Sequence, residues 1–475
     1  MTAAQVIRTV VLVLVSAFAA HSATAEEALS TLRQSATVAD IFEADHTNQF
    51  VIDIEAALAR AQAAHGVIPQ SAADEITRKA NIRFAPTVAV KAERKIVQHR
   101  MVALLNVWRR ALDEEAGQFL HYGATTVDIY DTVLTLQLRR SVVLIIGHMR
   151  DLESIMIKLA DTHRDAVMAG RTLGQHAMPI TFGKKVATWI GENRRNIERL
   201  KVVLVELDHS AILKGAVGTY AGLGERAIEV ERTFAKELGL KEPYPDDWHG
   251  SRDVYAAYAQ ALALISRSYG RIGQELFLLQ MTDLGETSEP RDEASVSSSS
   301  MAQKVNPSKS EALIQGGRTI PRLAEVALDD VVNFFERDNT SGPNATLEEI
   351  SIKSEQNLKV AKELLASIEV NRDAMRRNID RSEGFMLAQR VVFALSAKLG
   401  KETAEEKVRA VIHKALDDGS DFRTALTADA EISGILKPTD LDTLLKPEGY
   451  TGLANEEVDA VIAHAKRLAG TDPVE

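Results

Sequence analysis

The sequence contains no cysteine among its 475 residues, so a disulfide, a thiolate nucleophile and a cysteine metal site are all excluded. It also has no HExxH or similar paired-histidine spacing. We therefore expect no metal and no other cofactor. Aromatic residues are few, at 5%, but 45% of the chain is hydrophobic and 26% is charged. This balance is typical of a globular protein and excludes a disordered or fibrous chain.

Long runs of basic residues are absent as well. Lysine and arginine total 56 and aspartate and glutamate total 67, which gives a formal net charge of −11. A surface of this sign repels a phosphate backbone. Nucleic acid is therefore not expected as a partner.

The first 25 residues differ from the rest. Arg8 precedes an apolar stretch from Val10 to Ala20, and Ala23-Thr-Ala25 has the small-x-small form of a signal-peptidase site. The apolar stretch is shorter than the ~20 residues that span a membrane. We predict a signal peptide at residues 1–25 and a periplasmic or secreted protein, with no membrane contact after cleavage. The alternatives are an uncleaved anchor, or a cytoplasmic protein whose start codon is assigned too far upstream.

Proline is missing from two long stretches, between Pro86 and Pro179 and between Pro343 and Pro438. Within the first stretch, apolar residues from Val133 to Leu159 keep helical spacing, which predicts a long buried helix. Similar patterns run through four further segments: 187–213, 252–283, 308–335 and 350–383. Five long helices predict an all-α bundle, and no alternating pattern is strong enough to place a strand.

These helices exceed the average of ~11 residues, and several are apolar on more than one side. One bundle cannot bury all of that surface, so we predict a homo-oligomer. The predicted domains are an N-terminal helical domain at 26–127, a central long-helix bundle at 128–383 and a C-terminal helical domain at 384–475.

A serine cluster marks the most informative segment, which reads Ser295-Val-Ser-Ser-Ser-Ser-Met-Ala-Gln-Lys-Val-Asn-Pro-Ser-Lys-Ser-Glu311. Four consecutive serines cannot form a core, so residues 295–300 are predicted to be a mobile loop. Asn306 and Pro307 then form an N-cap and first-turn pair, with Ser308 as the alternative cap. A helix N-terminus beside Lys304 favours binding of a carboxylate. The alternative is that the segment binds nothing and is a flexible linker before an ordinary helix.

This segment resembles a signature of the fumarase/aspartase superfamily. The matching positions are Ser298, Ser299, Met301, Lys304, Asn306, Pro307 and Glu311, whereas Ser297 and Ala302 replace the usual glycine and proline. Two further signature blocks are similar, at His121–Thr132 and Gly170–Gly183. Shorter matches follow at Trp248–Asp253, Phe335–Asp338 and Pro447–Gly452. The resemblance favours the branch that contains adenylosuccinate lyase and 3-carboxy-cis,cis-muconate cycloisomerase.

The resemblance implies an all-α homotetramer in which three blocks from three subunits build each site. By position, Ser298 would remove the proton next to a substrate carboxylate, while Lys304 and Asn306 hold that carboxylate. The other substrate-binding residues that it implies are Thr125, Thr126, Asp128, Arg171, Thr172, Gln175, His249, Arg252, Ser299 and Met301.

A proton donor for the leaving group is not obvious. Leu173 occupies the position at which relatives that cleave adenylosuccinate or argininosuccinate carry histidine, and leucine cannot transfer a proton. His121 and His176 are the candidate catalytic replacements, and His249 is a third candidate acid. Each of them has an alternative interpretation as a hydrogen-bonded structural residue. A leaving group that departs unaided would need no acid.

The first functional hypothesis is a lyase that performs β-elimination on a succinyl-type or carboxylated substrate. It would cleave a carbon–nitrogen or carbon–oxygen bond and release fumarate or a related unsaturated acid. The first alternative is a lactonising enzyme similar to 3-carboxy-cis,cis-muconate cycloisomerase, which Leu173 favours. The second is a non-catalytic binding or structural paralogue, because Ser297, Ala302 and Leu173 depart from the family pattern.

Overall fold

A computed structural model describes residues 35–246, 248–290, 301, 303–332, 334–338 and 342–473. The predicted signal peptide, residues 1–25, lies outside these ranges. So does the predicted loop at 295–300 with Ser298 and Ser299, and these predictions stay predictions. Within the described residues, no helix is both long and apolar enough to cross a membrane.

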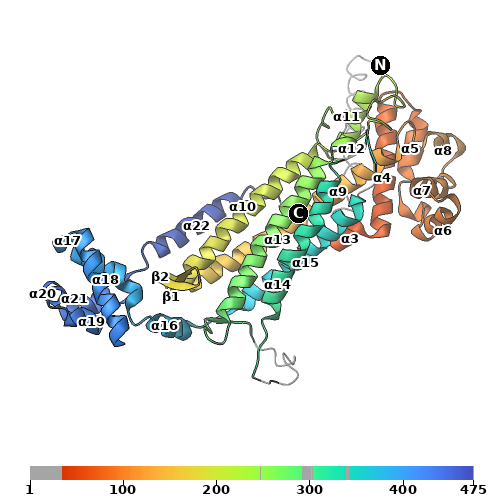
Figure 1. Ribbon diagram of the computed structural model, residues 1–475. Coiled ribbons are helices and arrows are strands. Elements are labelled where there is room, and N and C mark those ends of the chain that lie inside the picture. Colours follow the sequence, from red (N-terminus) through yellow and green to blue (C-terminus); the bar gives the residue numbers. More distant parts are fainter. Residues whose placement is uncertain are drawn as a thin grey trace, which may run out of the picture.

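Five long helices form the body of the molecule (Figure 1), which confirms the predicted all-α bundle. They are α9 (Thr126–Thr162), α10 (Phe182–Asp208), α13 (Asp253–Leu279), α14 (Ser308–Asp329) and α15 (Pro343–Ser367). α13 and α14 approach closely where two glycines meet: a Cβ on Gly317 would lie 2.9 Å from the Cα of Gly270. Only glycine permits backbones this close.

The last of the five predicted helices, 350–383, is interrupted. α15 ends at Ser367 and is followed by the short strand β4 (Glu369–Val370) and by α16 (Arg372–Asp380). β4 pairs with β3 (Thr287–Ser288), which lies far away in the sequence. An isolated two-residue strand is too short to show an alternating pattern, so no local pattern predicts it.

A hairpin follows α9 directly. β1 (Val167–Thr172) and β2 (Gln175–Thr181) pair in antiparallel register, with Thr172 opposite Gln175. No strand was expected here, because Met168, Ala169 and Gly170 are buried consecutively instead of alternating with exposed positions.

The N-terminal helices cover one end of the bundle, at the right of Figure 1. They are α3 (Val38–Phe42), α4 (Ala44–Ala64), α5 (Gln70–Arg78), η1 (Ile82–Phe84), α6 (Thr87–Val97), α7 (Arg100–Arg109) and α8 (Glu114–Phe119). Two further helices, α11 (Ala227–Glu237) and α12 (Trp248–Ser251), lie at the same end. The core of α4 is continuous with that of the bundle.

Small helices with a core of their own lie at the opposite end (Figure 1). They are η2 (Phe385–Leu387), α17 (Ala388–Leu399), α18 (Lys401–Asp418), α19 (Phe422–Ala428), α20 (Ala430–Ile435), α21 (Pro438–Leu444) and η3 (Pro447–Gly449). The last helix, α22 (Ala454–Ala469), returns to lie along α10, and Asp472 beyond it binds the buried Arg194 at 2.8 Å. The predicted domain boundaries stay predictions.

Candidate active site

The first two signature blocks lie at opposite ends of α9. Block one, His121–Thr132, contains the start of this helix, and block two, Gly170–Gly183, begins a few residues after its end. The helix has 37 residues, so at about 1.5 Å per residue it spans about 55 Å. The blocks of one chain are thus too far apart to share a small substrate (Figure 1).

Blocks two and three lie at the same end of the bundle. The guanidinium of Arg171 donates to both carboxylate oxygens of Glu286, at 2.6 and 3.0 Å. Glu286 is completely buried and also accepts a hydrogen bond of 2.8 Å from Asn378. This ion pair fixes the hairpin to the chain leading into the serine cluster. The substrate contact of Arg171 stays a prediction.

The start of α14 corrects the predicted carboxylate site. The amides of Lys309 and Ser310 both donate to the buried carboxylate of Glu289, at 3.0 and 2.9 Å, and the Ser310 hydroxyl donates to it at 2.8 Å. The Ser308 and Glu311 amides bond to backbone carbonyls. All four first-turn amides are satisfied within the chain, so the prediction that they bind a substrate carboxylate is wrong.

The predicted caps of this helix are also wrong. α14 begins at Ser308, and its N-cap position is occupied by Pro307, which makes no side-chain capping hydrogen bond. The carboxylate of Glu289, from an earlier segment, caps the helix instead. Two of the predicted carboxylate ligands, Lys304 and Asn306, lie just before the helix, the first exposed and the second half-buried. Met301 is exposed.

The tip of the β1–β2 hairpin projects from the subunit. Leu173 and Gly174 form its two-residue turn, both with positive φ, 52° and 78°, and the Leu173 side chain is 101% exposed. Leucine costs about 1 kcal/mol or more in this conformation. Thr172 and Gln175 flank the turn and are exposed. No burial within the described residues offsets this cost for Leu173.

His176 follows on the same hairpin. It is half-buried and pairs across the strands with Arg171. Burial lowers the pKa of its imidazole, and the charge of Arg171 lowers it further. A ring held neutral at ordinary pH is a poor source of a proton.

Block one places Asp128 in a structural role. Its carboxylate is completely buried and accepts the amides of Thr125 at 2.9 Å, Lys214 at 3.0 Å and Gly215 at 3.2 Å. These bonds fix the start of α9 against a neighbouring loop. The contact of Asp128 with substrate stays a prediction. Thr125 and Thr126 remain half-buried at the helix start.

The residues of the Trp248–Asp253 motif belong to the same buried network. His249 lies 2.7 Å from Asp131 and 3.2 Å from Asp128, and burial disfavours its charge, but the two carboxylates outweigh this and raise its pKa to about 9. Arg252 binds Asp131 at 2.8 Å and Asp330 at 2.9 Å. Both side chains are enclosed by acids that the sequence did not pair with them. Their role in substrate binding stays a prediction.

His121 has the geometry of a proton donor. Its Nδ1 lies 2.6 Å from Oε1 of Glu55, whose side chain is completely buried. Burial lowers the pKa of the imidazole, yet the hydrogen bond and charge of Glu55 prevail and the pKa is raised. The side chain is 18% exposed, and φ of His121 is +62°. The sequence analysis missed Glu55, although an acid within the apolar run of α4 was the available signal.

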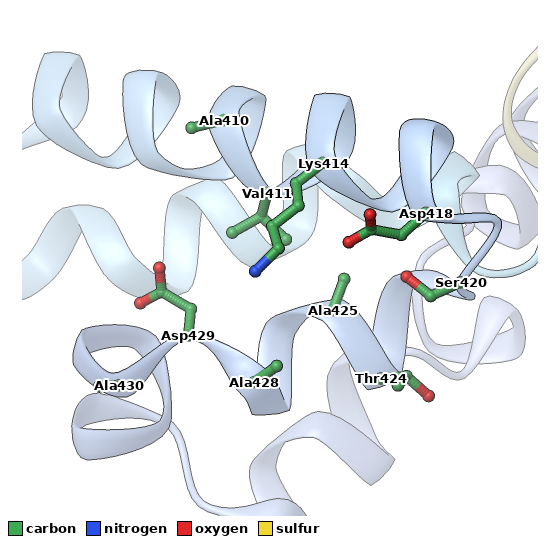
Figure 2. Close-up of a pocket in the computed structure, with 10 residues that line it drawn as sticks. All are labelled: Ala410, Val411, Lys414, Asp418, Ser420, Thr424, Ala425, Ala428, Asp429 and Ala430. Carbon is green, nitrogen blue, oxygen red and sulfur yellow. The ribbon is translucent and has the colours of Figure 1, made fainter.

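A cavity of about 490 Å³ opens elsewhere, between α18 and α19. Figure 2 shows Lys414, Asp418 and Asp429 around it. None of the predicted site residues lines this cavity. The candidate site is therefore placed at the two ends of the bundle, where the signature blocks lie, and not in this cavity.

Comparison with known proteins decides the family. A family described as "Lyase" matches residues 31–321, and "Adenylosuccinate lyase C-terminus" matches residues 384–461. Adenylosuccinate lyase of Methanocaldococcus jannaschii is 33% identical over 430 residues, which cover 90% of this chain and 93% of the relative. This chain belongs to the lyases of the fumarase/aspartase superfamily.

Two other relatives of the lyase act on different compounds. The N-acetyl-S-(2-succino)cysteine lyase of Dickeya dadantii is 34% identical over 416 residues, covering 87% of this chain and 91% of the relative. The structure of 3-carboxy-cis,cis-muconate lactonizing enzyme from Pseudomonas putida superimposes with a TM-score of 0.82 at 30% identity, covering 91% of the lyase and 97% of that chain. The relatives of this chain thus include both lyases and a lactonizing enzyme.

Proposed function

We propose that this lyase eliminates a leaving group from a succinyl-type substrate and releases fumarate or a related unsaturated acid. The scissile bond joins carbon to nitrogen, to oxygen or, as the name of the Dickeya relative suggests, to sulfur. The observation that carries the proposal is the pair of His121 with Glu55, at 2.6 Å. It supplies a proton donor to a chain in which Leu173 replaces the family's histidine.

The reaction needs a base, an anion site and an acid. Ser298, as an alkoxide, removes the proton from the carbon next to a carboxylate, and Lys304 and Asn306 stabilise the negative charge that develops there. The bond to the leaving group then breaks, and that group takes a proton from His121. A serine hydroxyl is a weak base, so surrounding donors and closure of the serine segment are needed to activate it.

We further propose a homotetramer with sites shared between subunits. The length of α9 supports this, because block one of a chain must meet blocks two and three of other chains. Exposed apolar side chains along the bundle also support it, since they leave surface to cover. They are Val202 and Val205 on α10, Leu264 and Leu278 on α13 and Leu328 on α14.

The test incubates the protein with a panel of succinyl conjugates of amines, alcohols and thiols and detects released fumarate by its ultraviolet absorbance. We expect turnover of at least one conjugate, and we expect Ser298→Ala to lower kcat by about a hundredfold or more with an unchanged circular dichroism spectrum. A fully active Ser298→Ala variant would refute the mechanism. An enzyme that turns over no dicarboxylate would instead support the non-catalytic paralogue.

A second candidate is lactonisation of a carboxymuconate-like acid. Leu173 favours it, because it removes the acid that relatives use to expel a leaving group, and the fold of the Pseudomonas putida enzyme is close. Loss of carboxymuconate absorbance without formation of fumarate would identify this activity. Fumarate release from a conjugate would exclude it as the main reaction.

We also propose that residues 1–25 direct export to the periplasm or the medium. The apolar stretch and the Ala23-Thr-Ala25 site support this. Mass spectrometry of the purified protein from its native host should find a mature N-terminus near Glu26. A protein that retains Met1 and fractionates with the cytoplasm would contradict export.

A further inference from the structure

Arg100 and Tyr130 form an unusual pair beside block one. Arg100 is the first residue of α7, and Tyr130 lies on α9. The guanidinium carbon of Arg100 lies 3.6 Å from the centroid of the Tyr130 ring, so the guanidinium stacks on the ring face. Tyr130 is buried, whereas Arg100 is exposed. The ring holds the guanidinium in place and leaves its N–H groups available.

No carboxylate neutralises this arginine. Other arginines of the N-terminal helices have acidic partners: Arg60 binds Glu237 at 2.7 Å and Arg110 binds Glu93 at 2.6 Å. In the part of the chain that the structure describes, no carboxylate oxygen lies within 4 Å of Arg100. The nearest acid that influences it, Asp131, is already bound by His249 and Arg252.

The surroundings of Arg100 are unfavourable for a lone cation. Although the residue as a whole is exposed, desolvation of the guanidinium by the groups packed around it lowers its pKa. Tyr130 and Asp131 oppose this, and the charges of Arg337 and Arg94 lower the pKa further. Arg100 also stands at the N-terminus of α7, where the helix dipole repels positive charge. A bound anion would relieve the repulsion between these positive charges.

The position of Arg100 connects it to the candidate site. Tyr130 and Thr126 are four residues apart on α9, so they share one face of the helix, one turn of about 5.4 Å apart. Glu55, which binds His121, also acts electrostatically on Tyr130. Arg100, Thr126 and the proposed acid therefore gather at one end of α9.

We propose that Arg100 binds an anionic group, a carboxylate or a phosphate, carried by the leaving fragment of the substrate. The planar fork of arginine matches such oxyanions. Arg100 lies at the same end of α9 as His121, the proposed proton donor to the leaving group. The anion at Arg100 is therefore assigned to the leaving fragment, and the two carboxylates of the succinyl half are assigned to the rest of the site, where Lys304 and Asn306 take the one next to the reacting carbon. This assignment rests on the proposed elimination, because only a conjugate has a second fragment.

The test measures the binding of leaving fragments to the intact lyase by calorimetry and needs no turnover. One pair of probes is N-acetylcysteine and its uncharged amide, and the other is adenosine monophosphate and adenosine. We expect the anionic member of at least one pair to bind at least about tenfold more tightly than its neutral partner. The pair that shows the preference tells a carboxylate from a phosphate.

Variants then assign the preference to Arg100. Arg100→Gln should abolish the difference between the anionic and neutral probes. Arg83→Gln is the matched control, because Arg83 is an exposed arginine that stacks on Phe84 at 4.7 Å, and it should keep the difference. Absence of any anionic preference in the wild type, or a preference that survives Arg100→Gln, would overturn the proposal.

These outcomes are separate from those of the elimination assay. Anion preference at Arg100 with no fumarate release would refute the proposed reaction and keep the anion site. Fumarate release with no anion preference would refute the anion site at Arg100 and keep the proposed elimination.

Discussion

His121 is bonded through Nδ1 to Oε1 of Glu55 at 2.6 Å, and the acid is completely buried. The other oxygen of Glu55 has no hydrogen-bond partner within the described residues. The carboxylate therefore directs its side-chain hydrogen bond to the imidazole, favouring its protonated form and fixing which nitrogen faces outward. In a lyase whose hairpin carries Leu173, this pair is the best source of the proton that elimination requires.

Replacing Glu55 should change the pH dependence of turnover. The raised pKa of His121 keeps the imidazolium populated above pH 6.5, and activity should fall as the pH rises through that pKa. In Glu55→Gln, burial still lowers the pKa of His121, and of the two acids that raise it only Asp128 remains. The decline in kcat should move to lower pH, with a loss of about tenfold at pH 8. Steady-state rates from pH 5.5 to 9.5 measure this.

Glu75→Gln is the control for that series, because Glu75 is a buried acid of the same domain that binds Lys79 rather than a histidine. It should leave the pH profile unchanged. A Glu55→Gln profile that coincides with the wild type would show that His121 is not the donor.

Alkaline pH should destabilise the fold through His249. Its pKa is raised to about 9 in the folded chain, above the ordinary histidine value of 6.5. The stabilisation is therefore complete below pH 6.5 and is lost as the pH rises through about 9. It amounts to at most on the order of 3 kcal/mol per subunit. The midpoint temperature of thermal unfolding should therefore decrease as the pH is raised from 7 to 9.5.

The variant His249→Gln isolates this effect. It should have a lower midpoint than the wild type at pH 6.5 and a smaller decline toward pH 9.5, because it cannot lose a proton there. Equal slopes for the two proteins would contradict the assignment.

Removal of Glu289 should weaken the start of α14. In Glu289→Ala, two backbone amides and the Ser310 hydroxyl lose their acceptor, which should destabilise the protein by about 1–3 kcal/mol. Because Lys304 lies just before this helix, KM for the substrate should also rise. Glu289→Gln keeps one acceptor oxygen and should be intermediate. Urea unfolding and steady-state kinetics test both; an unaffected Glu289→Ala would reject the capping role.

Leu173→Asn should separate stability from activity. Asparagine tolerates positive φ and is preferred before glycine in this type of hairpin turn. The free energy of unfolding should therefore rise by about 0.5–1 kcal/mol, and the thermal midpoint should not fall. If the tip enters a site built with other subunits, kcat/KM should fall. Unchanged kinetics would show that the leucine side chain does not reach the substrate.

Much of the fold followed from the sequence because long proline-free segments with helical spacing have few other solutions. Val133 to Leu159 lie within α9 as expected. The hairpin did not follow, because consecutive burial of Met168 and Ala169 depends on contacts with distant segments. The break after Ser367 depends on pairing with Thr287 and Ser288, which a local pattern cannot express.

The candidate site was harder, because side-chain partners decide it. Arg171, His249 and Arg252 were each expected at the substrate, yet each is neutralised by an acid far away in the sequence. The same holds for Glu289, which occupies the amides expected to bind a carboxylate. The motifs singled out these residues, but they did not reveal which of them were already paired with acids.

The central claim is that one site takes His121 and Ser298 from different subunits, and subunit mixing tests it most directly. Inactive His121→Asn and Ser298→Ala proteins would be unfolded together in equal amounts, refolded and assayed. Random assembly leaves about a quarter of the sites with neither substitution, so about a quarter of the wild-type activity should return. Activity that stays at the level of the separately refolded variants would contradict the account.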